Sequence, residues 1–247
     1  MLHAIVALIA VAPLTAGTAT FDHSVFDRLL KAHVAEAMVD YDAFARAPGF
    51  PAYLEQLARA QPDTLSRNEQ LAYWINVYNA YTIQLVNAHQ ERKSIRNINK
   101  TLGVIKAMGP WKEEMVKAGG KTMSLDFVEH EIVRKRFREP RIHFALVCAA
   151  KSCPPLRREA YTGDRLESQL DDQARIFIAR SPQSTRVDVK AATVYLSPIF
   201  VWFKDDFGPD LGQFLARYVP DGPARRLLES GKYKVVETKY DWSLNSK

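Results

Sequence analysis

Reactive side chains are concentrated in the stretch Arg141–Leu156, RIHFALVCAAKSCPPL. It holds His143 and both cysteines of the chain, Cys148 and Cys153, and ends in a pair of prolines. The segment Ile142–Ala149 is apolar on both alternating faces, which predicts an inner β-strand. A strand that delivers polar side chains to a loop at its end is a common way to build a site.

One hypothesis for this stretch is a thiol hydrolase or acyl transferase. Cys153 would be the nucleophile and His143 the base, because a neighbouring imidazole raises the ionised fraction of a thiol. The group that orients the imidazole would be Asp241, Asn76 or Asn79. The site layout would be papain-like, although with the histidine first in the chain. The bonds attacked would be peptide, amide or thioester bonds.

The alternative is a non-enzymatic ligand- or protein-binding module in which Cys148 and Cys153 form a disulfide. Their short separation allows such a bond if the strand ends near Ala149. His143 and the two asparagines would then form a polar network in the core. The candidate binding residues are Asn76, Asn79, Tyr41, Lys151, Ser152 and His130. Because the His and Cys spacings match no common zinc pattern, we predict neither a metal nor a cofactor.

Helical periodicity is strongest over Leu65–His89, where Ser66 is a good N-cap and aromatic residues suggest a buried central helix. Ser124 caps a second helix, Leu125–Phe137, and an amphipathic helix follows at Leu166–Arg180. Arg186–Lys190 and Thr193–Ser197 form a hairpin pattern. These elements predict an α+β fold: one compact, helix-rich domain over residues 20–247 with a small, mostly antiparallel sheet.

Composition and termini narrow the class of protein. Residues 1–19 contain a short apolar run followed by small residues, which predicts a signal peptide and a periplasmic or secreted bacterial protein. No later segment is long and apolar enough to cross a membrane. The formal charge of +6 is spread along the chain, which does not favour nucleic acid as a partner. We expect a small-molecule or peptide ligand of the cell envelope; the sequence does not indicate the oligomeric state.

Four blocks resemble the bacterial, exported branch of the domain-of-unknown-function 547 family. They are Val39–Tyr41, YWINVYNAYTIQLV from Tyr73 to Val86, the segment Ser124–Leu156, and VYLSPIFVWFKDDFG (Val194–Gly208) with the YDWSLN end (Tyr240–Asn245). The resemblance covers nearly all of the chain after residue 19. It implies an exported or envelope protein, and it assigns no activity.

Overall fold

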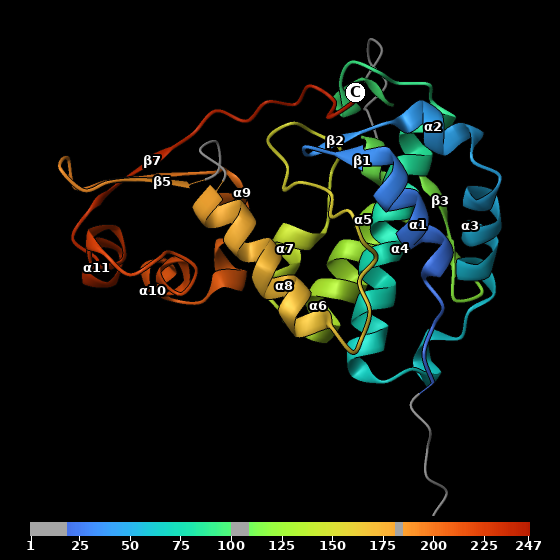
Figure 1. Cartoon of the computed structure of the whole chain (residues 1–247), viewed down its shortest axis with the longest axis horizontal. Coiled ribbons are helices and arrows are strands. Elements are labelled where there is room, and N and C mark those ends of the chain that lie inside the picture. The colour runs from blue at the N-terminus through green and yellow to red at the C-terminus, as the bar shows by residue number, and fades with distance from the viewer. Residues whose placement is uncertain (1–18, 100–108, 181–184) are drawn as a thin grey trace, which may run out of the picture.

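The longest helix, α4 (Arg67–Ala88), is the element against which the others pack. Ser66 caps its start by accepting a hydrogen bond from the Glu69 N–H at 3.4 Å, as predicted. Every side chain from Leu71 to Ile83 is buried. A helix buried on all sides lies inside its domain, and Figure 1 shows α4 with α1 and α3 on one side and α5 and α6 on the other.

This computed structural model describes residues 19–99, 109–180 and 185–247, and it confirms the predicted helix-rich α+β fold in one compact domain. The remaining helices are α1 (Ser24–His33), α2 (Tyr41–Arg46), α3 (Gly49–Arg59), α5 (Leu125–Phe127), α6 (Lys135–Phe137), α7 (Ile142–Ala145), α8 (Leu166–Arg175), α9 (Ile199–Trp202), α10 (Leu211–Ala216) and α11 (Pro223–Ser230). The predicted signal peptide lies outside the described residues except for Ala19, and it stays a prediction.

Two of the predicted helices are confirmed and contain a wider, π-helical turn. The helix that Ser124 caps runs through α5, a π-helical stretch Val128–Arg134 and α6. In the same way, α8 continues into a π-helical stretch Ile176–Arg180. In the part of the chain that the structure describes, no helix is long and apolar enough to span a bilayer.

Within the described residues, the strands form three small sheets where the sequence predicts one. Two are antiparallel hairpins, β1 (Val34–Ala35) with β2 (Met38–Val39) and β3 (Glu114–Ala118) with β4 (Lys121–Ser124). The third has the order β5 (Thr185–Asp188), β6 (Thr193–Leu196), β7 (Lys234–Glu237). Its first pair is the predicted hairpin, and β7 adds to β6 in parallel.

The predicted strand Ile142–Ala149 is wrong. Ile142–Ala145 is instead one helical turn, α7, and the chain becomes extended at Leu146. This turn lies between two hydrophobic clusters: Ile142 and Ala145 pack into the large cluster around α4, whereas Phe144 packs into a second cluster built from α8, α9, α10 and β6. A single turn buried between two cores is apolar on every side, which gives the same sequence pattern as a buried strand.

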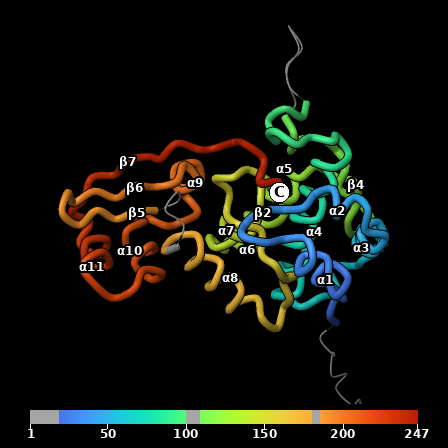
Figure 2. Tube along the Cα trace, turned by 45° about the horizontal axis from the view of Figure 1, so that its top comes forward, coloured from blue at the N-terminus to red at the C-terminus, as the bar shows by residue number. Residues whose placement is uncertain are grey.

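The last residues of the chain return from the third sheet to the main body and pack along it. Figures 1 and 2 show this tail, residues 238–247, running from β7 back to the loops beside β2. Its backbone bonds to three separate segments: Leu244 N–H to Lys93 O at 2.8 Å, Asn245 N–H to Ala149 O at 3.0 Å, and Val39 N–H to Asn245 O at 2.8 Å. The tail therefore ties together parts of the chain that are far apart in sequence.

We expect Leu244→Ala to destabilise the protein by about 2–4 kcal/mol, because it leaves a cavity where the tail enters the core. Leu244 is 3% exposed and belongs to the large hydrophobic cluster. Val236→Ala in β7 is the matched control, since Val236 is 42% exposed and should change the free energy of unfolding by less than about 1 kcal/mol. Urea denaturation measures both, and equal effects would contradict the anchoring role of the tail.

Candidate functional site

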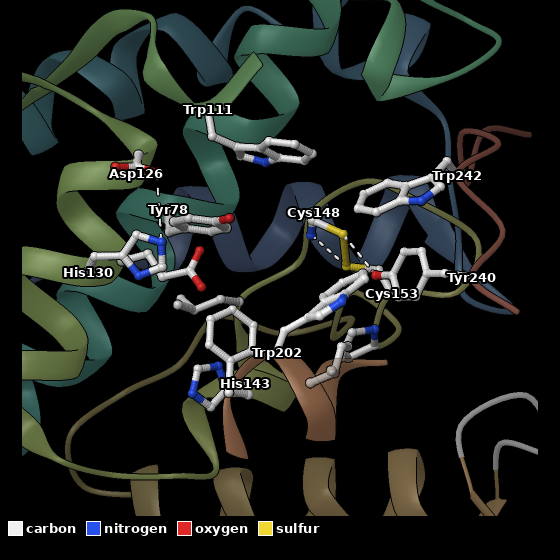
Figure 3. Close-up of a pocket in the computed structure, with 15 residues that line it drawn as sticks. Tyr78, Trp111, Asp126, His130, His143, Cys148, Cys153, Trp202, Tyr240 and Trp242 are labelled. Atoms are coloured by element: carbon white, nitrogen blue, oxygen red, sulfur yellow. Dashed lines mark hydrogen bonds and ion pairs between the residues drawn. A yellow bond between two sulfur atoms is a disulfide. The ribbon is translucent and has the colours of Figure 1, made fainter. Parts of the chain in front are cut away.

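A pocket with a cavity volume of about 170 Å³ lies where the tail, α9, the Cys148–Cys153 loop and the α5–α6 helix meet. Figure 3 shows its centre bordered by Trp111, Tyr78, Trp202 and the disulfide. It is lined by Tyr78, Trp111, Asp126, Glu129, His130, His143, Leu146, Cys148, Cys153, Pro154, Ile199, Trp202, Phe203, Tyr240 and Trp242. Of the residues predicted to form a site, Cys153, His143 and His130 line it.

Four of these side chains form what we call the aromatic wall: Trp111, Trp202, Tyr240 and Trp242. Ring centroids are 4.5 Å apart for Tyr240–Trp242, 5.7 Å for Trp202–Trp242 and 6.0 Å for Trp111–Trp242. These are normal distances for interacting aromatic rings. Trp202 is 48% exposed at the pocket rim, and an apolar side chain of this size is left exposed at interaction sites more often than elsewhere.

The opposite side of the pocket is polar and comes from the helix that begins at Leu125. Asp126, Glu129 and His130 of this helix all line the pocket, and Figure 3 shows Asp126 and His130 on this side. Glu129 accepts a hydrogen bond from the Tyr78 hydroxyl, and burial together with this carboxylate raises the pKa of Tyr78 well above its usual value of 10. Tyr78 is therefore a neutral donor at physiological pH, and Glu129 is held in place by it.

His130 lies between two side chains of its own helix. Its Nδ1 lies 3.0 Å from Nη1 of Arg134. A guanidinium can only donate, so Nδ1 is the acceptor in this contact. Nε2 faces Asp126 Oδ1 at 3.7 Å. The ring is thus held between Arg134 and Asp126.

Cys148 and Cys153 form a disulfide in the pocket wall, with their Cα atoms 6.0 Å apart. The N–H of Cys148 also donates to Sγ of Cys153 at 2.7 Å, and the Tyr240 hydroxyl lies 3.2 Å from Sγ of Cys148. Burial raises the pKa of Tyr240 above its usual value, so this hydroxyl also stays protonated. The pair matches the disulfide alternative, and in this state Cys153 carries no thiolate.

His143 is bound to Asp206, a residue that the sequence analysis did not single out. The distance from His143 Nε2 to Asp206 Oδ2 is 2.6 Å, and Arg134 reaches the same carboxylate at 2.6 and 3.0 Å. These hydrogen bonds, that from His143 first, hold the pKa of Asp206 well below its usual range. The imidazole also stacks on Phe203 with centroids 4.0 Å apart.

The imidazole is therefore oriented by Asp206, and Asp241 does not take the predicted role. Asp241 lies in the tail, where its carboxylate accepts the N–H of Ser243 at 2.8 Å. Among the described residues no hydrogen bond joins His143 to Cys153. The carboxylate partner was missed because Asp206 follows an aromatic run, PIFVWFKDDF, whose Asp pair looks like an ordinary solvated turn.

The two asparagines of α4 hold loops in place and do not reach the pocket. Asn76 donates to the carbonyl of Tyr161 at 2.8 Å and accepts its N–H at 3.0 Å. Asn79 makes the same pair of bonds to Ala145 O and Val147 N, both at 2.9 Å. Each Asn side chain thus supplies hydrogen-bond partners for a backbone N–H and a carbonyl of a loop inside the core. Asn79 fixes the exit from α7 and so positions the Cys148–Cys153 loop.

Tyr41, Lys151 and Ser152 also serve the tail and lie outside the pocket lining. The Tyr41 hydroxyl donates to Asn245 Oδ1 at 2.6 Å in a buried position. The Lys151 N–H donates to Ser243 O at 2.8 Å, and Ser152 Oγ accepts the Asp241 N–H at 2.8 Å. These three residues therefore hold the tail beside the pocket.

Sequence reasoning found one side of the site and missed the aromatic wall. Three of the four tryptophans of the chain line the pocket. Their position in loops and short helices is the feature of the sequence that could have indicated the aromatic wall. In the part of the chain that the structure describes, no three His, Cys, Asp or Glu side chains group as a metal ion would require. The arrangement can hold a small molecule between aromatic rings and carboxylates.

Residues 62–178 match the family model described as "Protein of unknown function, DUF547". No curated protein and no solved structure is significantly similar to the chain. The matched range includes Tyr78, Trp111, Glu129 and the disulfide, whereas Trp202, Asp206, Tyr240 and Trp242 follow it. The pocket is thus completed by side chains from beyond the matched range.

We expect neither cysteine to react with iodoacetamide before reduction and both to react after it, as read by intact mass. Opening the six-residue ring should lower stability by about 2 kcal/mol in the chain-entropy model, or Tm by about 4–8 °C. The double variant Cys148→Ser/Cys153→Ser is the control, because its Tm should not respond to reductant. Labelling without reductant would contradict the disulfide.

We expect Asp206→Asn to lower the free energy of unfolding by about 1–3 kcal/mol at pH 7. The substitution weakens the hydrogen bonds that His143 and Arg134 make to this side chain. Since the pKa of Asp206 is depressed in the folded state, its stabilisation is present above its ordinary pKa of 3.8 and is lost as pH falls below it. The difference in the free energy of unfolding between wild type and Asp206→Asn should therefore become smaller as the pH falls from about 5 to 2. Asp205→Asn, at the exposed neighbour, is the control; a gap that widens in acid would contradict the assignment.

Proposed function

We propose that this protein is a non-enzymatic binding module that holds a small organic ligand in the pocket beside the Cys148–Cys153 disulfide. One observation carries the proposal: a mostly apolar cavity with an aromatic wall is assembled from segments far apart in the sequence and held by buried hydrogen bonds. Ligand sites are typically concave and apolar with a few placed polar groups. The aromatic wall supplies the apolar part, and Glu129, Asp126 and Tyr78 supply the polar part.

The thiol hydrolase or acyl transferase is the weaker candidate on this geometry. It needs a free Cys153 with a base within hydrogen-bond reach. Cys153 is instead in a disulfide, and among the described residues no hydrogen bond joins it to His143, whose Nε2 binds Asp206 at 2.6 Å. Activating Cys153 would require reduction of the disulfide and also the approach of the other ring nitrogen, Nδ1, to hydrogen-bond distance. Both requirements favour the binding module.

The proposal places the binding outside the cytoplasm. The predicted signal peptide in residues 1–19 supports this location, and so does the disulfide, because such bonds persist in oxidising compartments such as the bacterial periplasm. The ligand would then be a small molecule or peptide fragment of the cell envelope.

The test uses N-phenyl-1-naphthylamine, a neutral fluorophore that brightens in apolar surroundings. We expect a saturable rise in fluorescence with one probe per chain, and an affinity about five-fold or more weaker in Trp202→Ala, which removes part of the aromatic wall. Phe127→Ala is the matched control, because Phe127 is 45% exposed on the neighbouring helix and lies outside the lining. A response that is absent, or that both variants weaken equally, would overturn the proposal.

A further inference from the structure

The pocket combines aromatic rings with carboxylates, a pairing that suits a positively charged ligand. The faces of aromatic rings carry negative potential and attract ammonium groups, most strongly for Trp. Two rings of the pocket already receive cations of the protein: the guanidinium of Arg96 lies 5.3 Å from the Trp242 ring, and that of Arg134 lies 5.1 Å from the Phe203 ring. The wall therefore has the electrostatic character that cation binding needs.

The charges around the cavity leave an excess of negative charge on its polar side. Arg134 lies on the same helix as Glu129 and interacts with it electrostatically. Asp206 binds Arg134 at 2.6 and 3.0 Å, so the charges of Arg134 and Asp206 offset each other. Among the described residues, no Lys or Arg forms an ion pair with the carboxylate of Asp126 or Glu129. Asp126 faces only Nε2 of His130, at 3.7 Å. The described lining contains no Lys or Arg, although the chain has 34 of them.

We infer that the pocket binds an organic cation, an alkylated ammonium group, between the aromatic wall and the carboxylates of Glu129 and Asp126. This inference rests on the proposed binding function and names its ligand class. The ammonium carbons would contact Trp111 and Trp202, while Glu129, held by Tyr78, supplies the opposite charge. A neutral ligand of the same shape would gain the apolar contact only.

The test titrates the full chain by calorimetry with choline and with 3,3-dimethyl-1-butanol, which replaces the ammonium nitrogen of choline by carbon. We expect choline to bind saturably and the neutral isostere to bind at least about ten-fold more weakly. Glu129→Gln keeps an acceptor for Tyr78 and removes the charge, so it should weaken choline about ten-fold without changing Tm. Glu131→Gln is the matched control two positions along, outside the lining, and should leave the affinity for choline unchanged.

The outcomes separate this inference from the proposed function. If N-phenyl-1-naphthylamine binds at the aromatic wall but choline does not, or if choline and its neutral isostere bind equally, the cation inference fails and the binding module stands. If neither the fluorophore nor choline binds, both fail. If Glu131→Gln weakens choline as much as Glu129→Gln, the attraction comes from the overall field of the helix, and the assignment to Glu129 is wrong.

Discussion

The site depends on one constraint, the passage of residues 241–247 between loops that would otherwise have no common support. Backbone hydrogen bonds join this tail to Lys93, Ala149, Lys151 and Val39. Ala149 has a left-handed backbone, with φ of 66°, which is uncommon for a residue with a Cβ and needs surrounding structure to hold it. The bond from Asn245 N–H to Ala149 O at 3.0 Å supplies that support. The same tail carries Tyr240 and Trp242 into the pocket.

The asparagines of α4 act from the other side of the same loop. An Asn inside a helix is unfavourable unless its amide has partners elsewhere. The amide of Asn79 has its partners in the backbone of Ala145 and Val147. The central helix thus holds the chain just before Cys148, and the tail holds it just after Cys148, at Ala149. The Cys148–Cys153 ring is thus held at both ends. This explains how an irregular loop, without a sheet beneath it, presents a fixed surface to the cavity.

Local patterns in the sequence predicted the elements whose stability is local. The periodicity of α4, its Ser66 cap, the Ser124 cap and the β5–β6 hairpin all depend on near neighbours, and each is present. The turn α7 has the apolar pattern of a buried strand because it is buried between two separate cores. A short apolar run does not show which of the two structures it forms. Asp206 and Trp242 reach the site through tertiary packing alone, so no spacing in the sequence links them to His143 or to the cysteines.

The choice between a thiol enzyme and a binding site depends on the state of Cys153, which is in a disulfide, and on its contact with the imidazole of His143. The sequence leaves this open, because a Cys and a His ten positions apart suit either arrangement. In the folded chain the carboxylate of Asp206 is ionised and partly buried. An ionised carboxylate is a stronger hydrogen-bond acceptor for an imidazole N–H than a thiol is. Stacking on Phe203 at 4.0 Å fixes the ring plane as well. These two contacts join His143 to the turn that follows α9, the short helix that carries Trp202 at the rim of the pocket.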